Sequence, residues 1–284
     1  MQIIENKWNL IITISLSLLS SFLILIWIFK FSAYGIDFTD EGYYLNWISN
    51  PFLYKASISQ FGFIYHPLYN LLDGNITWLR RLNFTITFSL SFTLFFLLIN
   101  NFNYLGKVNK AFQVTLSCGI AISSLTYLYI QTPSYNHLTL QALLLTCLGV
   151  IIAQNSKSNK KIFGFIIIGL GGWLTFMAKP SSALGLSLTI LIYLLVTKKF
   201  QLRYLFFTLL TLFILLIISA FFIDGSLITY LERYNLQLEL SKLIESGHSI
   251  GAIFRIDELK IPLEVKQSII YIFLISIFLF YLDF

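Results

Sequence analysis

Long uncharged apolar stretches constrain the fold of this chain more than any other feature of its sequence. A helix needs about 20 mostly apolar residues to cross the hydrocarbon core of a bilayer, and most of the stretches approach this length. They lie at about 9–29, 83–99, 111–130, 137–153, 163–178, 183–197, 204–223 and 267–283. We therefore expect an all-α membrane protein, a polytopic helical bundle of about eight transmembrane helices that forms a single transmembrane domain over residues 1–284.

The composition fits lipid rather than water as the solvent. Only 11% of the residues are charged and 57% are apolar, whereas soluble domains average about 25% charged residues. The two cysteines, Cys118 and Cys147, lie in apolar runs, which excludes a disulfide scaffold. The net charge of +6 does not indicate nucleic acid as a partner, because lysines that flank membrane spans produce the same excess. The expected partner is the lipid bilayer.

The short loops between the spans predict the orientation of the chain. If the N-terminus is cytoplasmic, the inner loops are 100–110, 154–162 and 198–203. They carry no acidic residue, and their basic residues are Lys107, Lys110, Lys157, Lys160, Lys161, Lys198, Lys199 and Arg203. This distribution follows the positive-inside rule. We therefore expect an integral protein of the bacterial plasma (inner) membrane, whose first apolar run is retained as a helix because it has no signal-peptide cleavage site.

Ionisable residues are absent from the middle of every predicted span. Ion-coupled transporters and proton pumps need such residues at mid-membrane, where they are costly and kept only for function, so their absence argues against this class of protein. The polar residues lie instead in two long outer segments, about 30–82 and 224–266. Any chemistry is therefore expected at the outer, periplasmic face.

An acidic cluster opens the first outer segment, in the run Asp37-Phe38-Thr39-Asp40-Glu41-Gly42-Tyr43-Tyr44. A carboxylate that is partly desolvated against aromatic rings accepts a proton more readily, so the cluster suits a general base. Carboxylate oxygens also suit a hard divalent cation, for which Asp37 and Asp40 are the candidate ligands. Alternatively, Thr39 or Asp40 caps a helix that runs through Ile48. The sequence leaves these three interpretations open.

Three of the basic residues expected on the outer side stand out as candidates for binding an anion. Adjacent arginines such as Arg80 and Arg81 bind phosphate groups bidentately, which favours a lipid phosphate as a partner. The alternatives are a pair that reaches ordinary headgroups or a salt bridge to Asp73. Lys179 precedes Pro180, which breaks the helix and frees backbone groups that can line a polar cavity. Its alternative interpretation is also a lysine that reaches the headgroups.

Other outer residues give weaker signals. His66 has no second histidine nearby, so it does not indicate a zinc site, and a hydrogen-bonded structural histidine is the simpler interpretation. The uncharged turn at 131–137 is rich in hydrogen-bonding groups, which suit sugar hydroxyls as well as a helix cap. The stretch 227–245 has leucines among charges and predicts an amphipathic interfacial helix.

The order of these features resembles the GT-C membrane glycosyltransferases, in particular the protein O-mannosyltransferases and the bacterial aminoarabinose transferases. The residues that carry the resemblance are Asp40-Glu41-Gly42-Tyr43-Tyr44-Leu45, Pro67-Leu68, Gly74 and Leu79-Arg80-Arg81-Leu82-Asn83. The likeness covers about residues 8–100 by motif and about 8–266 by topology only. It implies a GT-C-like fold that transfers a sugar, with inversion, from a polyprenyl-phosphate-sugar donor to a lipid, glycan or protein acceptor on the outer face.

The resemblance also implies roles for single residues. Asp40 matches the catalytic acidic residue of the first outer loop and would act as the base on the acceptor, with Glu41 in support. The candidate substrate-binding residues are Arg80, Arg81, Lys179, Tyr43 and His66, of which the cationic ones would hold the lipid phosphate. No cofactor is implied with certainty, and a divalent cation at Asp37 and Asp40 is the only candidate.

The chain departs from the family in length, because members usually carry more helices and often an outer domain. A chain that ends at Phe284 is therefore expected to be a short member, half of a split pair or a truncated product. The alternative function is a non-catalytic flippase, exporter or assembly partner for polyprenyl-linked glycans. Asp40 discriminates between the two, because a transferase needs it absolutely whereas an exporter depends on groups within the spans.

Overall fold

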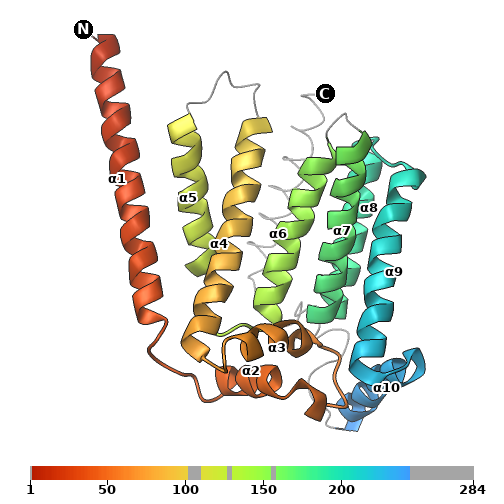
Figure 1. The fold of residues 1–284 in the computed structure, drawn as a ribbon. Coiled ribbons are helices and arrows are strands. Elements are labelled where there is room, and N and C mark those ends of the chain that lie inside the picture. The colour runs from red at the N-terminus through yellow and green to blue at the C-terminus, as the bar shows by residue number, and fades with distance from the viewer. Residues whose placement is uncertain (1, 102–109, 127–129, 155–157, 244–284) are drawn as a thin grey trace, which may run out of the picture. The chain divides into compact units, whose positions relative to one another are not determined.

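The computed structural model describes residues 2–101, 110–126, 130–154 and 158–243 (Figure 1). These residues form helices joined by turns, with no strand among them, which confirms the all-α class. The helices are α1 (Gln2–Phe31), α2 (Asp40–Ser49), η1 (Pro51–Leu53), α3 (Phe61–Leu71), α4 (Ile76–Asn101), α5 (Lys110–Thr126), α6 (Tyr135–Ala153), α7 (Ser158–Ala178), α8 (Pro180–Val196), α9 (Leu202–Asp224) and α10 (Leu227–Leu243). Residues Met1–Asn235 form one compact unit, which the following paragraphs describe, and a second unit comprises Leu236–Phe284.

Five helices in the described part of the chain are long and apolar enough to cross a membrane. They are Leu10–Phe31, Ile76–Asn101, Tyr135–Ala153, Ser158–Ala178 and Leu202–Asp224, and each coincides with a predicted span. Two further predicted spans, 111–130 and 183–197, correspond to α5 and α8, which are shorter helices of 17 residues each. The eighth predicted span, 267–283, lies outside the described residues.

The first outer segment ends earlier than the sequence predicts. α4 begins at Ile76, so residues 76–82 belong to this long helix rather than to the loop 30–82. Arg80 and Arg81 therefore lie in the first turns of α4. The two arginines predict the end of the loop by their charge, but a helix can include an arginine there when a partner compensates that charge.

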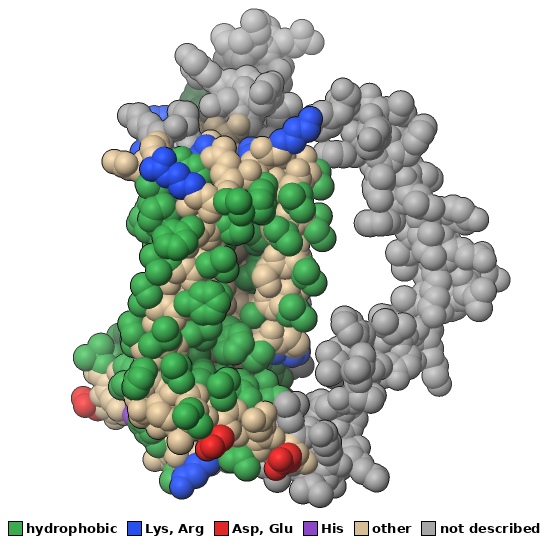
Figure 2. Space-filling model, turned by 90° about the vertical axis from the view of Figure 1, so that its right-hand side faces the viewer, with side chains coloured by type: hydrophobic (Ala, Val, Ile, Leu, Met, Phe, Trp, Pro, Cys, Tyr) green, Lys and Arg blue, Asp and Glu red, His purple; other side chains and the backbone are tan. Residues whose placement is uncertain are grey.

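Charged side chains separate toward the two ends of the helical unit. Figure 2 shows Lys and Arg gathered at one end of the face in view, whereas Asp and Glu lie toward the other end, together with some Lys or Arg. We call the first the basic end, with Lys160, Lys161, Lys198, Lys199 and Arg203, and the second the acidic end, with Asp37, Asp40, Glu41, Asp73 and Asp224. The predicted orientation, which follows the positive-inside rule, would place the basic end on the cytoplasmic side.

Close backbone packing holds α6 and α7 together at the centre of the unit. A Cβ added at Gly164 would lie 2.5 Å from the backbone nitrogen of Ala153 and 2.7 Å from the carbonyl oxygen of Gly149. Small residues allow membrane helices to approach each other this closely. Because the hydrophobic effect does not drive helices together within lipid, the van der Waals contact between their backbones stabilises the pair instead. The outward faces of α1 and α9 keep large apolar side chains exposed, as expected for surfaces that meet lipid tails.

α7 and α8 are separate antiparallel helices with Lys179 as the only residue between them. The beginning of α7 and the end of α8 both lie at the basic end, where they line the same cavity. Pro180 occupies the first position of α8, where a proline lacks no hydrogen bond that the helix needs. The break predicted at this proline is therefore a complete reversal of the chain at the acidic end.

At the acidic end α2, η1 and α3 form a layer across the ends of the longer helices (Figure 1). Trp47, Phe61 and Tyr65 of this layer are buried in one core with residues of α4, α6, α7, α9 and α10. Two hydrogen bonds fasten the layer to the last carbonyls of α7: the Gln60 nitrogen donates to the Met177 oxygen at 2.7 Å, and the Ser59 hydroxyl to the Ala178 oxygen at 2.7 Å. These carbonyls have no partner within α7, so the layer completes the helix.

Candidate functional site

The Asp37 side chain forms a hydrogen-bonded turn immediately before α2. Its Oδ1 atom accepts hydrogen bonds from the Thr39 backbone nitrogen at 2.8 Å and from the Thr39 hydroxyl at 2.5 Å. These two bonds, the side-chain bond first, hold the pKa of the exposed Asp37 carboxyl below its ordinary value of 3.8. Thr39 stands at the N-cap position of α2, as one of the predicted alternatives states, but its side chain makes no cap bond.

Glu41 is the buried member of the acidic cluster. Its Oε1 atom lies 2.8 Å from the Arg80 Nη2 atom and accepts a bond from the Thr132 nitrogen at 3.0 Å and another from the Thr132 hydroxyl. Its Oε2 atom accepts from the Asp37 nitrogen at 3.1 Å. Glu41 and Arg80 are only 4% and 2% exposed. A buried pair is stable only when its remaining hydrogen-bonding groups are satisfied, and this one is richly supplied with partners.

Arg80 uses its guanidinium to join three parts of the chain. Besides Glu41, its Nη1 atom donates to the Ser32 carbonyl at 2.9 Å and its Nη2 atom to the Gly35 carbonyl at 2.8 Å, just beyond α1. Its Nε atom lies 3.1 Å from the Thr132 hydroxyl, in the turn before α6. Arg80 therefore does not present a free fork toward a phosphate, and the predicted alternative of a bridge to Asp73 is replaced by the pair with Glu41.

Asp40 differs from Glu41, the next residue in the sequence, in both its burial and its hydrogen bonding. It lies in the first turn of α2 with its side chain exposed, and no hydrogen bond from the described residues reaches its carboxylate. On a helix the positions three and four residues away share its face, which places Tyr43 and Tyr44 beside it. The Asp40 charge contributes to the raised pKa of Tyr44, after the larger contributions of burial and Tyr135.

The aromatic side chains of α2 belong to a packed cluster. The ring of Tyr44 lies 5.8 Å from that of Tyr135, edge to face, and Trp47 stacks on Tyr54 with 4.4 Å between centroids. Tyr43 remains 49% exposed at the edge of the cluster. Burial, followed by the proximity of Tyr54 and Tyr135, raises the pKa of Tyr43 to about 12, so its hydroxyl stays protonated at neutral pH and can donate a hydrogen bond.

Arg81 and Lys179 are the more accessible cations of the candidate set. The Arg81 Nε atom lies 3.3 Å from the Ser32 hydroxyl, and its guanidinium carbon lies 4.9 Å from the centre of the Trp78 ring. No carboxylate among the described residues pairs with Arg81. Lys179 is exposed at the reversal between α7 and α8. The two arginines therefore differ in position: Arg80 is buried and bonded within the chain, whereas Arg81 lies nearer the surface.

His66 uses both of its ring nitrogens within the layer. Its Nδ1 atom lies 2.8 Å from the Ile48 carbonyl oxygen, and its Nε2 atom lies 3.0 Å from the Asn70 amide nitrogen. These partners assign the proton to Nδ1, which donates to the carbonyl while Nε2 accepts from Asn70. The geometry agrees with the interpretation of His66 as a hydrogen-bonded structural histidine that links α2 to α3.

The uncharged turn before α6 makes hydrogen bonds to other residues of the same chain. Thr132 serves Glu41 and Arg80, and the Ser134 hydroxyl accepts from the His137 nitrogen at 3.4 Å as the cap of α6. Sequence reasoning placed this turn at the outer face but missed Thr132 as a partner of the acidic cluster. Nothing local could have indicated it, because Thr132 lies 91 residues from Glu41.

Metal ligands do not cluster in the part of the chain that the structure describes. No group of three or more His, Cys, Asp or Glu side chains in the described ranges is arranged to hold a metal ion. Of the two candidate ligands, Asp37 already accepts two hydrogen bonds from Thr39, whereas Asp40 is exposed.

An apolar cavity lies near the acidic end between α3, α7 and α9. Its volume is about 280 Å³, and it is lined by Phe63, Ile64, Pro67, Trp173, Leu174, Met177, Ile218, Ser219, Phe222 and Ile223. The Trp173 indole nitrogen donates to the Ser219 hydroxyl at 2.9 Å, which satisfies both polar groups of the wall. The remaining surface suits a hydrocarbon chain. The segments of α7 and α9 resemble ordinary spans and α3 has no distinctive pattern, so nothing in the sequence indicates this cavity.

Comparison of the chain with models of known protein families, with curated protein sequences and with solved structures finds no match. The resemblance to the GT-C glycosyltransferases therefore remains a prediction from the motifs of the first outer segment. The function has to be argued from the geometry of the acidic end.

Proposed function

We propose that the protein is an integral membrane glycosyltransferase that moves a sugar from a polyprenyl-phosphate donor to an acceptor hydroxyl or amine at the acidic end. The observation that carries the proposal is the contrast between two adjacent carboxylates. Glu41 is buried in an ion pair that fixes the start of α2, and Asp40 is exposed on the same turn without a hydrogen-bond partner among the described residues. A carboxylate held in place but not engaged is what a general base requires.

In the proposed step Asp40 takes the proton of the acceptor. The acceptor oxygen or nitrogen then forms its bond to the anomeric carbon as the bond from that carbon to the phosphate oxygen breaks. The polyprenyl phosphate leaves with the electron pair of the broken bond. A positioned base of this kind typically contributes about 10²–10⁴-fold to the rate.

The donor lipid has matching features at the same end of the unit. The apolar cavity between α3, α7 and α9 offers a surface for the isoprenoid chain, and Met177 in its wall is two residues from Lys179. Lys179 is therefore our first candidate for contact with the donor phosphate, and Arg81 the second. Arg80 acts in this proposal through Glu41, as a residue that positions α2.

The sugar or the acceptor has a candidate contact in Tyr43. This ring is half exposed on the same face of α2 as Asp40, so it can pack against the apolar face of a sugar. Its raised pKa keeps the hydroxyl available as a donor to sugar oxygens.

Substitution of Asp40 by Asn tests the proposal. Cells that lack the gene are complemented with wild-type or variant protein, and polyprenyl-linked sugars and envelope glycans are compared by mass spectrometry. Asp40→Asn preserves the shape of the side chain but not its basicity, so we expect transfer to fall at least about 100-fold with normal amounts of folded protein.

Asp73→Asn is the matched control for the lost charge. Asp73 is also exposed at the acidic end, and it has a φ of 51°, a left-handed conformation that Asn accepts readily. This control should behave as wild type. Near-normal transfer by well-folded Asp40→Asn protein would contradict the proposal and favour the flippase, exporter or assembly partner instead.

A further inference from the structure

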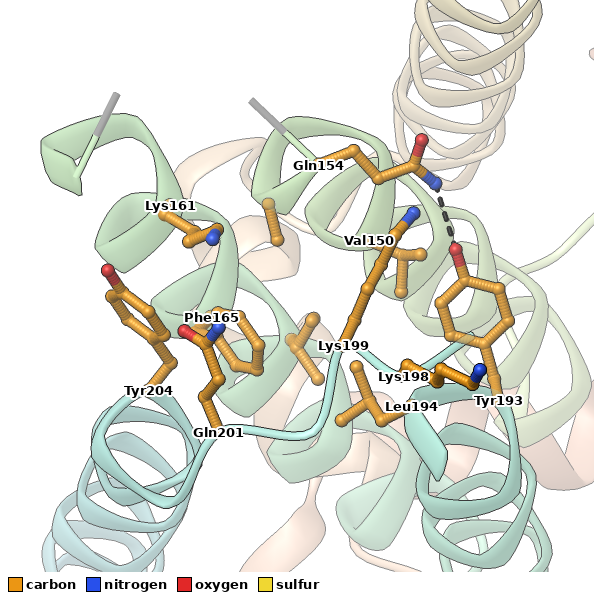
Figure 3. A pocket seen from close by; sticks show the side chains of 12 residues that line it. Val150, Gln154, Lys161, Phe165, Tyr193, Leu194, Lys198, Lys199, Gln201 and Tyr204 are labelled. Atoms are coloured by element: carbon orange, nitrogen blue, oxygen red, sulfur yellow. Dashed lines mark hydrogen bonds between the residues drawn. The ribbon is translucent and has the colours of Figure 1, made fainter. Parts of the chain in front are cut away.

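A second cavity lies at the basic end, far along the helices from the candidate site (Figure 3). It has a volume of about 120 Å³, and its walls come from the ends of α6 and α8 and the beginnings of α7 and α9. Its polar lining residues include Gln154, Lys161, Tyr193, Lys198, Lys199 and Tyr204. A water molecule needs only about 10–15 Å³ by a comparable measure, so the cavity has room for a small polar group with its waters.

Three lysines line this cavity, and no acidic residue from the described part of the chain does. The sequence contains no Asp or Glu between Asp73 and Asp224, so none of the four helices that form the walls can supply one from its cavity end. Below the lysines the walls are apolar, with Phe165, Ile168 and Leu194 buried in one cluster. Like charges above an apolar floor repel each other, and an anion between them removes that repulsion.

The polar groups of the walls are held in place. The Gln154 amide nitrogen donates to the Tyr193 hydroxyl at 2.9 Å, which leaves the amide oxygen and the second amide hydrogen free for other partners (Figure 3). The Lys161 Nζ atom lies 5.2 Å from the centre of the Tyr204 ring, which itself stacks on Phe165. Figure 3 shows Lys199 reaching from the turn toward Val150 and Gln154, while Lys161 lies beside Phe165 and Tyr204.

The turn after α8 carries two of the lysines, and one of them, Lys198, has a backbone conformation that lysine does not favour. The Lys198 nitrogen bonds to the Leu195 carbonyl and the Lys199 nitrogen to the Leu194 carbonyl, a Schellman ending of the helix. Lys198 has a φ of 53°, the left-handed position at which glycine is usual because it has no Cβ. A lysine at this position sacrifices stability in the turn, which is understandable if its charge has a function.

We propose that this cavity binds a phosphate group, supplied either by the headgroup of an anionic phospholipid in the adjacent leaflet or by a free phosphate compound. Lys161, Lys198 and Lys199 provide the charge, and Gln154 provides a hydrogen bond. Basic pockets between membrane helices on the cytoplasmic side are suited to anionic headgroups, because the field of that leaflet and the lysines act together. The proposal does not depend on the glycosyltransferase activity proposed above, because it concerns binding at the other end of the helices.

Calorimetric titration of the purified full chain in zwitterionic detergent tests the proposal. The probes are short-chain phosphatidic acid, short-chain phosphatidylcholine and inorganic phosphate. We expect one saturable site for phosphatidic acid and none for phosphatidylcholine. Comparable binding of inorganic phosphate would identify a free phosphate compound as the source, and its failure to bind would identify the lipid. Absence of binding by both phosphate probes overturns the proposal.

Variants locate the binding in the cavity. Lys198→Gly removes one charge and places glycine where the backbone favours it, so a loss of affinity cannot be attributed to unfolding. We expect the affinity for phosphatidic acid to fall about fivefold, which is the usual contribution of one basic residue near an anionic surface. When Lys161→Gln and Lys199→Gln are added, three such contributions are lost and the affinity should fall about 100-fold. Lys160→Gln, an exposed neighbour that does not line the cavity, should leave the affinity unchanged.

A charge-preserving variant separates the cavity from general surface charge. Val150→Phe adds bulk to the wall without changing any charge, so it should weaken phosphatidic acid binding by at least about tenfold if the phosphate enters the cavity. Equal losses for Lys198→Gly and Lys160→Gln, or full binding by folded Val150→Phe protein, would show attraction to the surface as a whole and overturn the proposal.

Discussion

The acidic and basic ends of the helical unit differ in whether their charged side chains have an oppositely charged partner within the chain. At the acidic end Glu41 and Arg80 are opposite charges, nearly inaccessible to solvent and surrounded by hydrogen-bond partners. At the basic end Lys161, Lys198 and Lys199 line a cavity to which the described residues contribute no acidic side chain. Charge that is compensated within the chain forms part of the fold, whereas charge that is not compensated is available to a ligand. Asp40 belongs to the second kind although it adjoins the first.

The largest effect that this comparison predicts is the loss of the buried pair. Arg80→Gln leaves the Glu41 carboxylate buried without its counter-ion, so we expect a loss of about 3–5 kcal/mol in the free energy of unfolding. Denaturant unfolding in mild detergent measures it. Arg81→Gln is the control, because this neighbouring arginine is only partly buried and pairs with no carboxylate in the described chain.

A double-mutant cycle sharpens the same prediction. Glu41→Gln removes the other partner, and Glu41→Gln combined with Arg80→Gln should cost clearly less than the sum of the two single losses. Additive losses would mean that the two side chains do not act as a pair, and the contrast between the two ends would then fail.

The next effect has the opposite sign and lies at the basic end. Lys198→Gly removes the Cβ from a residue with a left-handed backbone, which stabilises the folded turn. The greater conformational freedom of glycine in the unfolded chain offsets only part of this gain. We expect the protein to gain about 0.5–1 kcal/mol. Thermal unfolding in detergent without phosphate compounds measures the gain.

Lys199→Gly is the matched variant for this effect. Lys199 follows directly in the same turn but is not among the residues of positive φ, so glycine brings no relief there and should lower the melting temperature slightly. If Lys198→Gly is less stable than Lys199→Gly, the lysine at the turn does not cost stability and the argument from the turn is wrong.

The smallest effect concerns Asp37, whose carboxylate is compensated only by hydrogen bonds at the surface. Its pKa is lower in the folded chain than the ordinary 3.8, so its stabilising contribution is complete above that value and is lost as the pH falls through the folded pKa. Asp37→Asn should therefore melt slightly below wild type at pH 7, and the difference should shrink as the pH falls to about 3. A difference that persists unchanged at low pH would assign the effect to something other than the charge.

The sequence predicted the regular parts of the molecule well. Five predicted spans coincide with long apolar helices, and helices were expected over the start of α2 and over α10. These predictions succeed because length and hydropathy are local properties of a segment. α3 was not predicted, since a short apolar helix with Pro67 inside it has no distinctive local pattern.

The candidate site was predictable only in part. The cluster of Asp37, Asp40 and Glu41 and the pair of arginines were visible, and the structural interpretation of His66 agrees with its hydrogen bonds. The pairing of Glu41 with Arg80 was not visible, because the two residues lie 39 positions apart in the sequence. The resemblance implied different roles for Asp40 and Glu41, but the sequence did not indicate that one carboxylate and one arginine are buried while their neighbours are more accessible.

The sequence by itself determined the all-α class, the apolar helices and the separation of acidic and basic residues along the chain. These features follow from segment length and from the cost of leaving charge in hydrocarbon, which depend on composition alone. Only the tertiary structure decided that Glu41 meets Arg80, that Asp40 meets neither and that the lysines of α7 and the turn after α8 share one cavity. Helical phase and the packing of distant segments fix which side chains meet, and charge compensation depends on distances of a few ångströms that no single segment contains.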